Sequence, residues 1–184
     1  RLGFVKRQYM RLCYARTLSQ AFAVAVVSRA TADDLARLFG EDVARRQVLY
    51  LAADPAFRPA AADADAAAGA RATATVLARH RLRRPFILSV GELRPHKNAV
   101  GLLRAYAHSR SRATHDLVFV GQAHRDYREP WSVADALGLS AQVHILEDVG
   151  SGDLVSLYRA ADLFGLVSFY EGFGLPLLEA MACH

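Results

Sequence analysis

The chain has 184 residues, of which 53% are hydrophobic and 22% are charged. This balance is typical of a folded globular protein and excludes an intrinsically disordered chain. The longest apolar run, Ala21 to Val27, is far too short to span a bilayer. The two cysteines lack paired spacing and the seven histidines are scattered, so the sequence predicts neither a disulfide framework nor a metal site.

The formal net charge of +5 comes almost entirely from arginine, since Lys6 and Lys97 are the only lysines. No nucleic-acid-binding motif accompanies this charge, so we expect no nucleic-acid partner. The sequence begins with neither Met nor a signal peptide, and we expect a fragment or processed product of a cytoplasmic protein. Peripheral association with the inner face of the membrane stays open as an alternative, because residues 1–20 hold three aromatic and five basic side chains.

The first third of the chain predicts two helices and two strands. Hydrophobic residues recur at helical spacing in residues 1–20, which predicts a helix. Ala21–Val27 has the continuous apolar character of a buried strand. Thr31 is expected to cap a second helix that Gly40 ends, and Gln47–Leu51 is expected to form another strand.

A change of composition then separates two parts of the chain. The dipeptides Asp54-Pro55 and Arg58-Pro59 break the pattern and predict a hinge or linker. Residues 60–70 are almost entirely Ala, Asp and Gly. We expect a linker helix there that continues through Val76–His80. Compositional bias of the chain also explains the excess of Ala, and we expect both explanations to apply.

Strands and helices alternate through residues 86–182. Strands are expected at Phe86–Val90, Leu117–Val120, Val143–Leu146 and Leu163–Val167, and helices at Asn98–His108, Val133–Leu137, Asp153–Ala160 and from Pro176 onward. This order predicts an α/β fold with a Rossmann-like parallel sheet, covered by helices on both faces. Ligands bind beyond the carboxyl ends of the strands in such sheets, and Gly91, Gly121 and residues 168–174 occupy those ends.

The most informative segment, residues 171–179, reads EGFGLPLLE. Gly172 and Gly174 leave the backbone bare at the start of a helix whose first turn accepts Pro176. The N–H groups and dipole of a helix start favour anionic groups, and the Glu171 and Glu179 carboxylates accept hydrogen bonds from diols. This arrangement suits a ligand with both a phosphate and sugar hydroxyls. The alternative, which a glycine-rich turn taken alone would favour, is a strand-to-helix turn with no ligand and with Glu179 in solvent.

Residues 154–182 resemble the nucleotide-sugar signature of retaining glycosyltransferases of family 4. That signature places Ala-Asp before a strand, Ser at the strand end, and two Glu residues with seven residues between them. Ala161-Asp162, Ser168, Glu171 and Glu179 match these positions. The resemblance implies the B-type fold, called GT-B, in which two Rossmann-like domains face each other across a cleft.

Residues 90–98, VGELRPHKN, resemble the loop of that family that clamps the donor diphosphate, and Lys97 matches its lysine. An exposed cation that aids solubility is the alternative for Lys97. Two positions depart from the family, because His96 stands where Arg is common and Glu92 stands where a phosphate-friendly residue is frequent. We expect Glu92 to point away from the site, and Arg94 is a candidate to supply the missing charge.

The resemblance also assigns roles. Glu171 is the expected catalytic residue, in contact with the transferred sugar, while Glu179 binds the nucleotide ribose and Lys97 binds the diphosphate. The other expected residues of the nucleotide-sugar site lie in the same two loops: Gly91, Gly172, Phe173, Gly174 and Leu175. The implied donor is GDP-mannose or a UDP-hexose, the acceptor is a glycan, polysaccharide or lipid-linked glycan, and neither a metal nor a cofactor is implied.

The resemblance divides the chain into three segments. Residues 1–58 correspond to the end of the acceptor-side domain, residues 59–84 to a linker with its helix, and residues 85–184 to a nucleotide-sugar-binding domain truncated at its C-terminus. The predicted function is hexose transfer with retention of anomeric configuration. The family's pocket histidine lies further upstream, so we expect the isolated fragment to be inactive. A non-catalytic nucleotide-sugar-binding module and another GT-B enzyme, such as a sugar-nucleotide epimerase, are the alternatives.

Overall fold

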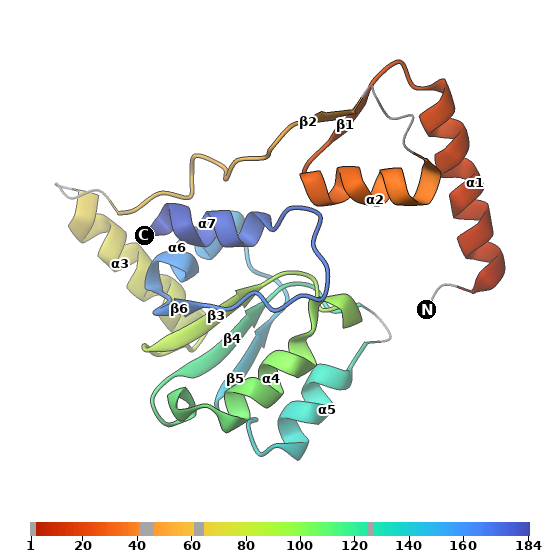
Figure 1. Cartoon of the computed structure of the whole chain (residues 1–184). Coiled ribbons are helices and arrows are strands. Elements are labelled where there is room, and N and C mark those ends of the chain that lie inside the picture. The colour runs from red at the N-terminus through yellow and green to blue at the C-terminus, as the bar shows by residue number, and fades with distance from the viewer. Residues whose placement is uncertain (1–2, 41–45, 61–64, 125–126) are drawn as a thin grey trace. The chain divides into compact units, whose positions relative to one another are not determined.

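The computed structural model describes residues 3–40, 46–60, 65–124 and 127–184. The chain divides into two compact units, Arg1–Leu51 and Ala52–His184, which we call the N-terminal and C-terminal units. The N-terminal unit holds a two-stranded sheet and the C-terminal unit is built around a four-stranded sheet (Figure 1). In the described part of the chain, no helix is both long and apolar enough to cross a membrane.

The N-terminal unit contains helices α1 (Phe4–Gln20) and α2 (Arg29–Phe39), so both predicted helices are confirmed. The predicted cap of the second helix is wrong. Ser28 caps α2, because its hydroxyl accepts a hydrogen bond from the backbone N–H of Thr31 at 3.1 Å. Ser is preferred over Thr in this role, and the helix begins earlier than expected. Gly40 ends α2 as predicted, with a φ of 94° that favours glycine.

Two short strands, β1 (Val24–Val26) and β2 (Arg46–Val48), pair in parallel in this unit. Both are shorter than the predicted strands Ala21–Val27 and Gln47–Leu51. Each strand has a single neighbour in its sheet. Each strand therefore extends only as far as its pairing with the other one. The residues beyond have β-propensity but no partner strand in the ranges that the structure describes, which is why the observed strands are shorter than predicted.

The C-terminal unit contains a parallel sheet with the strand order β5-β4-β3-β6. Its strands are β3 (Phe86–Val90), β4 (Asp116–Val120), β5 (Val143–Leu146) and β6 (Leu163–Phe164). The predicted bounds of β3 and β5 are confirmed, and β4 begins one residue earlier than predicted. The prediction for β6 was too long, because β6 is an edge strand that pairs with β3 only at Ile87 and Leu88.

Helices cover both faces of this sheet (Figure 1). Helices α3 (Asp65–Arg79), α6 (Ser151–Ala160) and α7 (Leu175–Cys183) pack on one face, and α4 (Ala99–His108) and α5 (Glu129–Ala136) pack on the other. Two short 3-10 helices, η1 (Pro95–Lys97) and η2 (Arg110–Ala113), complete the unit. The predicted α/β fold with a Rossmann-like parallel sheet is confirmed.

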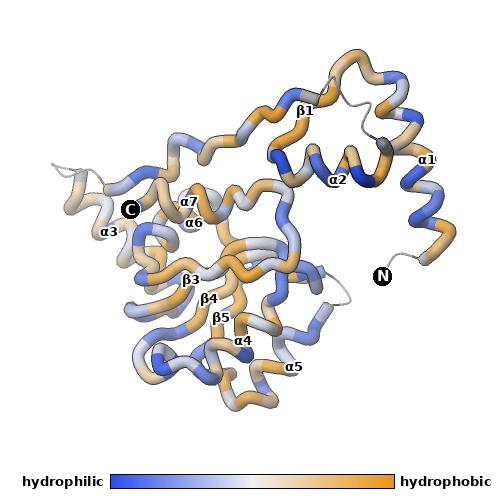
Figure 2. Tube along the Cα trace, in the orientation of Figure 1, coloured by the Kyte–Doolittle hydropathy of each residue, from blue (hydrophilic) through white to orange (hydrophobic). Residues whose placement is uncertain are grey.

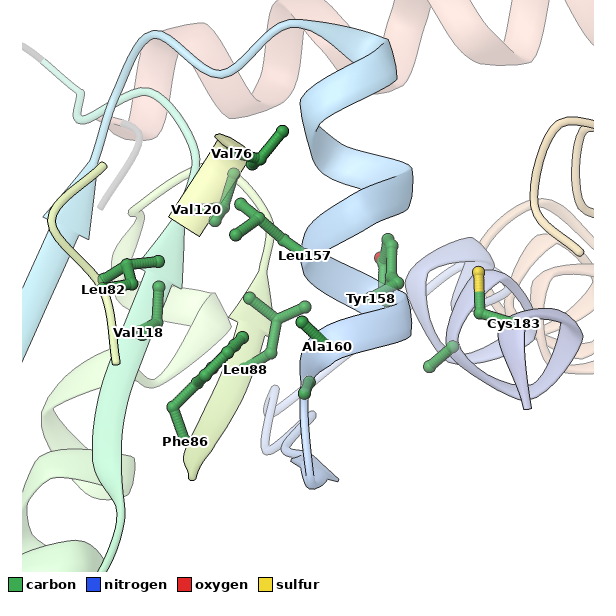
Figure 3. Close-up of a cluster of buried hydrophobic side chains, with 12 residues drawn as sticks. Val76, Leu82, Phe86, Leu88, Val118, Val120, Leu157, Tyr158, Ala160 and Cys183 are labelled. Atoms are coloured by element: carbon green, nitrogen blue, oxygen red, sulfur yellow. The ribbon is translucent and has the colours of Figure 1, made fainter. Parts of the chain in front are cut away.

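The alternation of side chains along β3 and β4 divides the core into two clusters. Phe86 and Leu88 are fully buried beside α6, whereas Ile87 lies in the cluster beneath α4. This alternation follows from the two-residue period of a strand. Figure 2 shows the central strands as mainly hydrophobic, and Figure 3 shows Val118 and Leu157 in the cluster between the sheet and α6. Each such side chain contributes about 1.5–3 kcal/mol of burial free energy.

Candidate functional site

The loops that follow the four parallel strands lie at one edge of the sheet, the carboxyl edge. Two glycines shape this edge. Gly91 and Gly121 have φ values of 147° and 151°, in a region that L side chains rarely adopt. A Cβ added to Gly121 would also collide with the carbonyl of Gly91. Glycine at this position therefore allows the loops after β3 and β4 to approach each other closely.

Lys97 and Glu171, which lie 74 residues apart in the sequence, are in direct contact at this edge. Lys97 Nζ donates hydrogen bonds to both carboxylate oxygens of Glu171, at 2.7 and 2.9 Å. Their side chains are only 22% and 23% exposed, so the pair is partly shielded from water. A small pocket beside them is lined in part by Gly91, Lys97 and Ser168. Four residues that the sequence analysis singled out, Gly91, Lys97, Ser168 and Glu171, thus lie together.

Glu171 is held by neighbours from both loops. Ser168 donates its hydroxyl to Glu171 Oε1 at 2.7 Å, in addition to the contacts from Lys97. Burial by itself raises the pKa of Glu171, but hydrogen bonds from Lys97 and Ser168 and the charge of Lys97 lower that pKa overall. The carboxylate is therefore ionised at neutral pH and acts as a hydrogen-bond acceptor.

Backbone and amide contacts join the same two loops. The backbone N–H of Phe169 donates to the carbonyl of His96 at 2.8 Å, and Asn98 Nδ2 donates to the carbonyl of Val167 at 3.1 Å. Asn98 has the left-handed φ of 59° that Asn tolerates better than most residues. A Cβ on Gly101 would run into the Asn98 amide, so Gly101 leaves room for that side chain. These contacts fix Lys97 relative to Glu171.

Glu92 and Arg94 form an ion pair with each other. Arg94 Nε lies 2.7 Å from Glu92 Oε1, and the two side chains are 42% and 44% exposed for Glu92 and Arg94 respectively. Each charge is thus balanced by its neighbour in the same loop. Arg94 is consequently engaged with Glu92 at the surface, and Lys97 is the loop cation that contacts Glu171.

Glu179 lies on α7 and is oriented by a buried tyrosine. The hydroxyl of Tyr158, on α6, donates to Glu179 Oε2 at 2.7 Å. Tyr158 is 1% exposed, and its ring packs edge-on against Phe57 with centroids 5.5 Å apart. Figure 3 shows Tyr158 projecting from α6 toward α7. Burial, with a further contribution from Glu179, raises the pKa of Tyr158 far above its usual range, so the hydroxyl stays a donor.

The start of α7 offers backbone donors at the same edge. Gly174 precedes the helix with a left-handed φ of 89°, and Pro176 occupies its first turn as predicted. Among the described residues, no side chain caps α7. Gly172, Phe173, Gly174 and Leu175 are all half-buried there. A helix start of this kind carries a partial positive charge, which favours an anion.

The structure adds residues to the edge that the sequence did not single out. Gln122 donates from Nε2 to the carbonyl of Glu147 at 2.7 Å and to Asp148 Oδ1 at 2.9 Å. The backbone N–H of Ala123 donates to Glu147 Oε1 at 3.2 Å. These contacts join the loops after β4 and β5. Their sequence signal is weak, since it consists only of polar residues that follow predicted strands. Tyr158 was missed because it follows Leu157 on an amphipathic helix, where an aromatic side chain is usually part of the core.

The structure shows no cluster of three or more His, Cys, Asp or Glu side chains arranged as metal ligands within the residues that it describes. The charged groups described at the carboxyl edge are instead Lys97, Arg94 and several carboxylates. Together with the α7 start, this set provides donors for an anion and acceptors for hydroxyl groups.

Comparison with known proteins identifies the family of the chain. Residues 78–184 match the family of group 1 glycosyl transferases. The chain is 30% identical over 179 residues to the O-antigen chain mannosyltransferase B of Escherichia coli, which covers 96% of this chain and 45% of that protein. It is 34% identical over 182 residues to a D-inositol 3-phosphate glycosyltransferase of Salinispora tropica, covering 91% of this chain and 36% of that protein. The chain thus spans less than half the length of these relatives.

Solved structures share the fold. WaaG, a glycosyltransferase involved in lipopolysaccharide biosynthesis, aligns with a TM-score of 0.78 and 21% identity over 99% of this chain and 48% of that protein. Anabaena HepE, solved in complex with UDP and glucose, aligns with a TM-score of 0.79 and 22% identity over 96% of this chain and 46% of that protein. Because the family match extends over more than half of the sequence, the chain belongs to the group 1 glycosyl transferases and contains a Rossmann-like domain of the GT-B fold.

Proposed function

We propose that this chain is the donor-binding part of a retaining glycosyltransferase of family 4. The enzyme transfers a hexose from a nucleotide diphosphate sugar to a glycan, polysaccharide or lipid-linked acceptor. The observation that carries the proposal is the contact between Lys97 and Glu171 at the carboxyl edge, the edge where α/β sheets bind their ligands.

In the proposed donor complex, the diphosphate lies between Lys97 and the start of α7. The Lys97 ammonium and the backbone N–H groups of Phe173 and Gly174 neutralise the charge that develops on the leaving diphosphate. Gly91 and Gly172, which carry no side chain, let the donor approach the backbone. Lys97 already contacts Glu171. A bound diphosphate therefore either shares the Lys97 ammonium with the Glu171 carboxylate or replaces that carboxylate as the partner of Lys97.

The two glutamates have separate roles in this proposal. Glu171 contacts the hydroxyl groups of the transferred sugar and is the catalytic residue, because it lies next to the cation that would bind the diphosphate. Glu179 accepts hydrogen bonds from the ribose hydroxyls. The hydrogen bond from Tyr158 occupies one of its oxygens and leaves the other available to the ligand.

The proposed donors are GDP-mannose and the UDP-hexoses. Two findings support this range: a similar curated protein is a mannosyltransferase, and HepE has been solved with UDP-glucose. In the same proposal, residues 1–58 belong to the acceptor-side domain, residues 59–84 form the linker, and residues 85–184 form the nucleotide-sugar-binding domain.

Calorimetric titration of the full-length protein with UDP-glucose and with GDP-mannose tests these roles. We expect Lys97→Ala and Glu179→Ala each to weaken binding of the cognate donor about tenfold or more, since each removes a charge-assisted contact. Arg104→Ala is the matched control, because Arg104 is an exposed cation on the following helix, α4. Unchanged donor affinity in both site variants would refute the assignment.

A further inference from the structure

A second polar pocket lies at the opposite edge of the same sheet. Its volume is about 510 Å³, which is within the range of ~300–1,000 Å³ typical of small-molecule sites. The pocket is lined by Arg81, Arg83, Arg84, Pro85, Thr114, Asp116, Ala141 and His144. We call this site the arginine pocket.

The arginine pocket is separate from the proposed donor site. Pro85 directly precedes β3, Asp116 is the first residue of β4, and His144 is the second residue of β5. These positions mark the amino ends of the strands, whereas Lys97 and Glu171 lie beyond the carboxyl ends. A ligand in the arginine pocket would therefore not compete directly with a nucleotide sugar.

The acidic groups near the pocket already have partners. Arg84 Nη2 lies 2.9 Å from Asp162 Oδ1, and His144 Nε2 lies 3.2 Å from Asp116 Oδ2. In contrast, neither Arg81 nor Arg83 has an acidic partner within the part of the chain that the structure describes. The pocket thus carries two guanidinium groups that form no ion pair with a described carboxylate, and the one carboxylate in its lining, Asp116, is hydrogen-bonded to His144.

The backbone that carries these arginines is held in place. Leu82 is only 6% exposed, and its N–H donates to the carbonyl of Leu77 at 2.8 Å. The N–H of Arg81 donates to the carbonyl of Ala78 at 3.1 Å, and Arg81 has the left-handed φ of 55°. The buried leucine therefore anchors the turn between Arg81 and Arg83, and both arginines remain exposed on the pocket side.

We propose that the arginine pocket binds a phosphate-bearing small molecule. A guanidinium group is always charged and presents paired N–H donors that match the oxygens of a phosphate group. Binding at this edge constitutes a second ligand site of the domain, remote from the proposed donor.

Titration of the protein with inorganic pyrophosphate, followed by hydrogen–deuterium exchange, tests this site. We expect pyrophosphate to slow exchange in residues 80–86 and 112–117. The double variant Arg81→Gln/Arg83→Gln should weaken this protection about tenfold or more, whereas any protection of residues 91–98 should persist. Both arginines are exposed, so the substitutions leave the core intact, which an unchanged Tm would verify.

Two controls make the outcome decisive. Arg104→Gln removes an exposed cation outside the pocket and should leave the protection unchanged. A parallel experiment with phosphatidylglycerol vesicles distinguishes a lipid phosphate from a soluble one: protection by vesicles alone assigns a lipid headgroup, and protection by pyrophosphate assigns a soluble ligand. No protection by either probe, or equal protection in the double variant, would overturn the proposal.

Discussion

Replacing Tyr158 by Phe tests whether a buried hydroxyl orients Glu179 for ligand binding. The substitution removes only the hydroxyl, which donates to Glu179 Oε2 at 2.7 Å. It preserves the ring that packs edge-on against Phe57. Because the side chain is 1% exposed and Phe has nearly the same shape, no large cavity forms. The effect of the variant can therefore be assigned to the lost hydrogen bond.

The expected magnitude follows from the charge of the acceptor. A hydrogen bond to a charged group contributes about 1.5–3 kcal/mol. Glu179 is half-buried, so water partly replaces the lost donor. We therefore expect the free energy of unfolding to fall by about 1–2 kcal/mol. Without the tyrosine the carboxylate is free to rotate, and we expect the affinity for the nucleoside diphosphate to fall about threefold to tenfold.

Tyr106→Phe is a matched control for this variant. Tyr106 is 2% exposed, and its hydroxyl donates to the neutral carbonyl of His115 at 2.7 Å. Its loss should lower the free energy of unfolding by about 0.5–1.5 kcal/mol without changing nucleotide affinity. Urea denaturation and calorimetric titration of both variants give the two quantities. Equal losses of nucleotide affinity in both variants, or no loss in Tyr158→Phe, would refute the positioning role.

Three further predictions concern the carboxyl edge. Gly121→Ala should lower the free energy of unfolding by about 2–4 kcal/mol, because its Cβ meets the Gly91 carbonyl. The control Gly138→Ala, also at positive φ but with open space around it, should lower it by only about 1–2 kcal/mol. Equal losses of stability in urea denaturation would contradict a steric collision at Gly121. Glu171→Gln should lose stability relative to wild type at neutral pH. The folded pKa of Glu171 lies below its ordinary value of 4.5. Its stabilising contribution is therefore present above pH 4.5 and is lost as the pH falls through the folded pKa. Denaturation at several values between about pH 7 and about pH 3 should show the stabilities of the two proteins converging in acid, and a stability difference that does not change with pH would count against the ion pair. Asn98→Ala removes the link to Val167 and should weaken donor binding about threefold, an effect absent from an exposed substitution such as Arg104→Ala.

The sequence predicted the strands β3 and β5 well because their signal is local. The apolar runs of β3 and β5 are bounded by a proline, a glycine or polar residues, and their bounds agree with the structure. The edge strand β6 was predicted less well, although the bounds of the other edge strand, β5, were predicted correctly. The apolar run from Leu163 to Val167 suggested a longer strand, but only its first two residues find a partner on β3. Strand length at an edge depends on the neighbour, which a single-sequence pattern does not contain.

The candidate site was likewise predictable only in part. The order of strands and loops predicted that Lys97 and the loop before α7 would share one edge of the sheet, because parallel strands bring their carboxyl ends together. The hydrogen bonds between Lys97 and Glu171 depend on side-chain conformation, and no spacing rule gives them. The contact of Tyr158 with Glu179 depends on how α6 packs against α7, so it became visible only in the fold.

The most direct test of the proposed donor site is a crystal structure of the full-length protein with its nucleotide sugar bound. The account predicts that the diphosphate contacts Lys97 Nζ and the start of α7, that the ribose hydroxyls donate to Glu179, and that the hexose lies against Glu171. A nucleotide bound elsewhere, with Lys97 and Glu179 both outside hydrogen-bonding distance of it, would contradict the account.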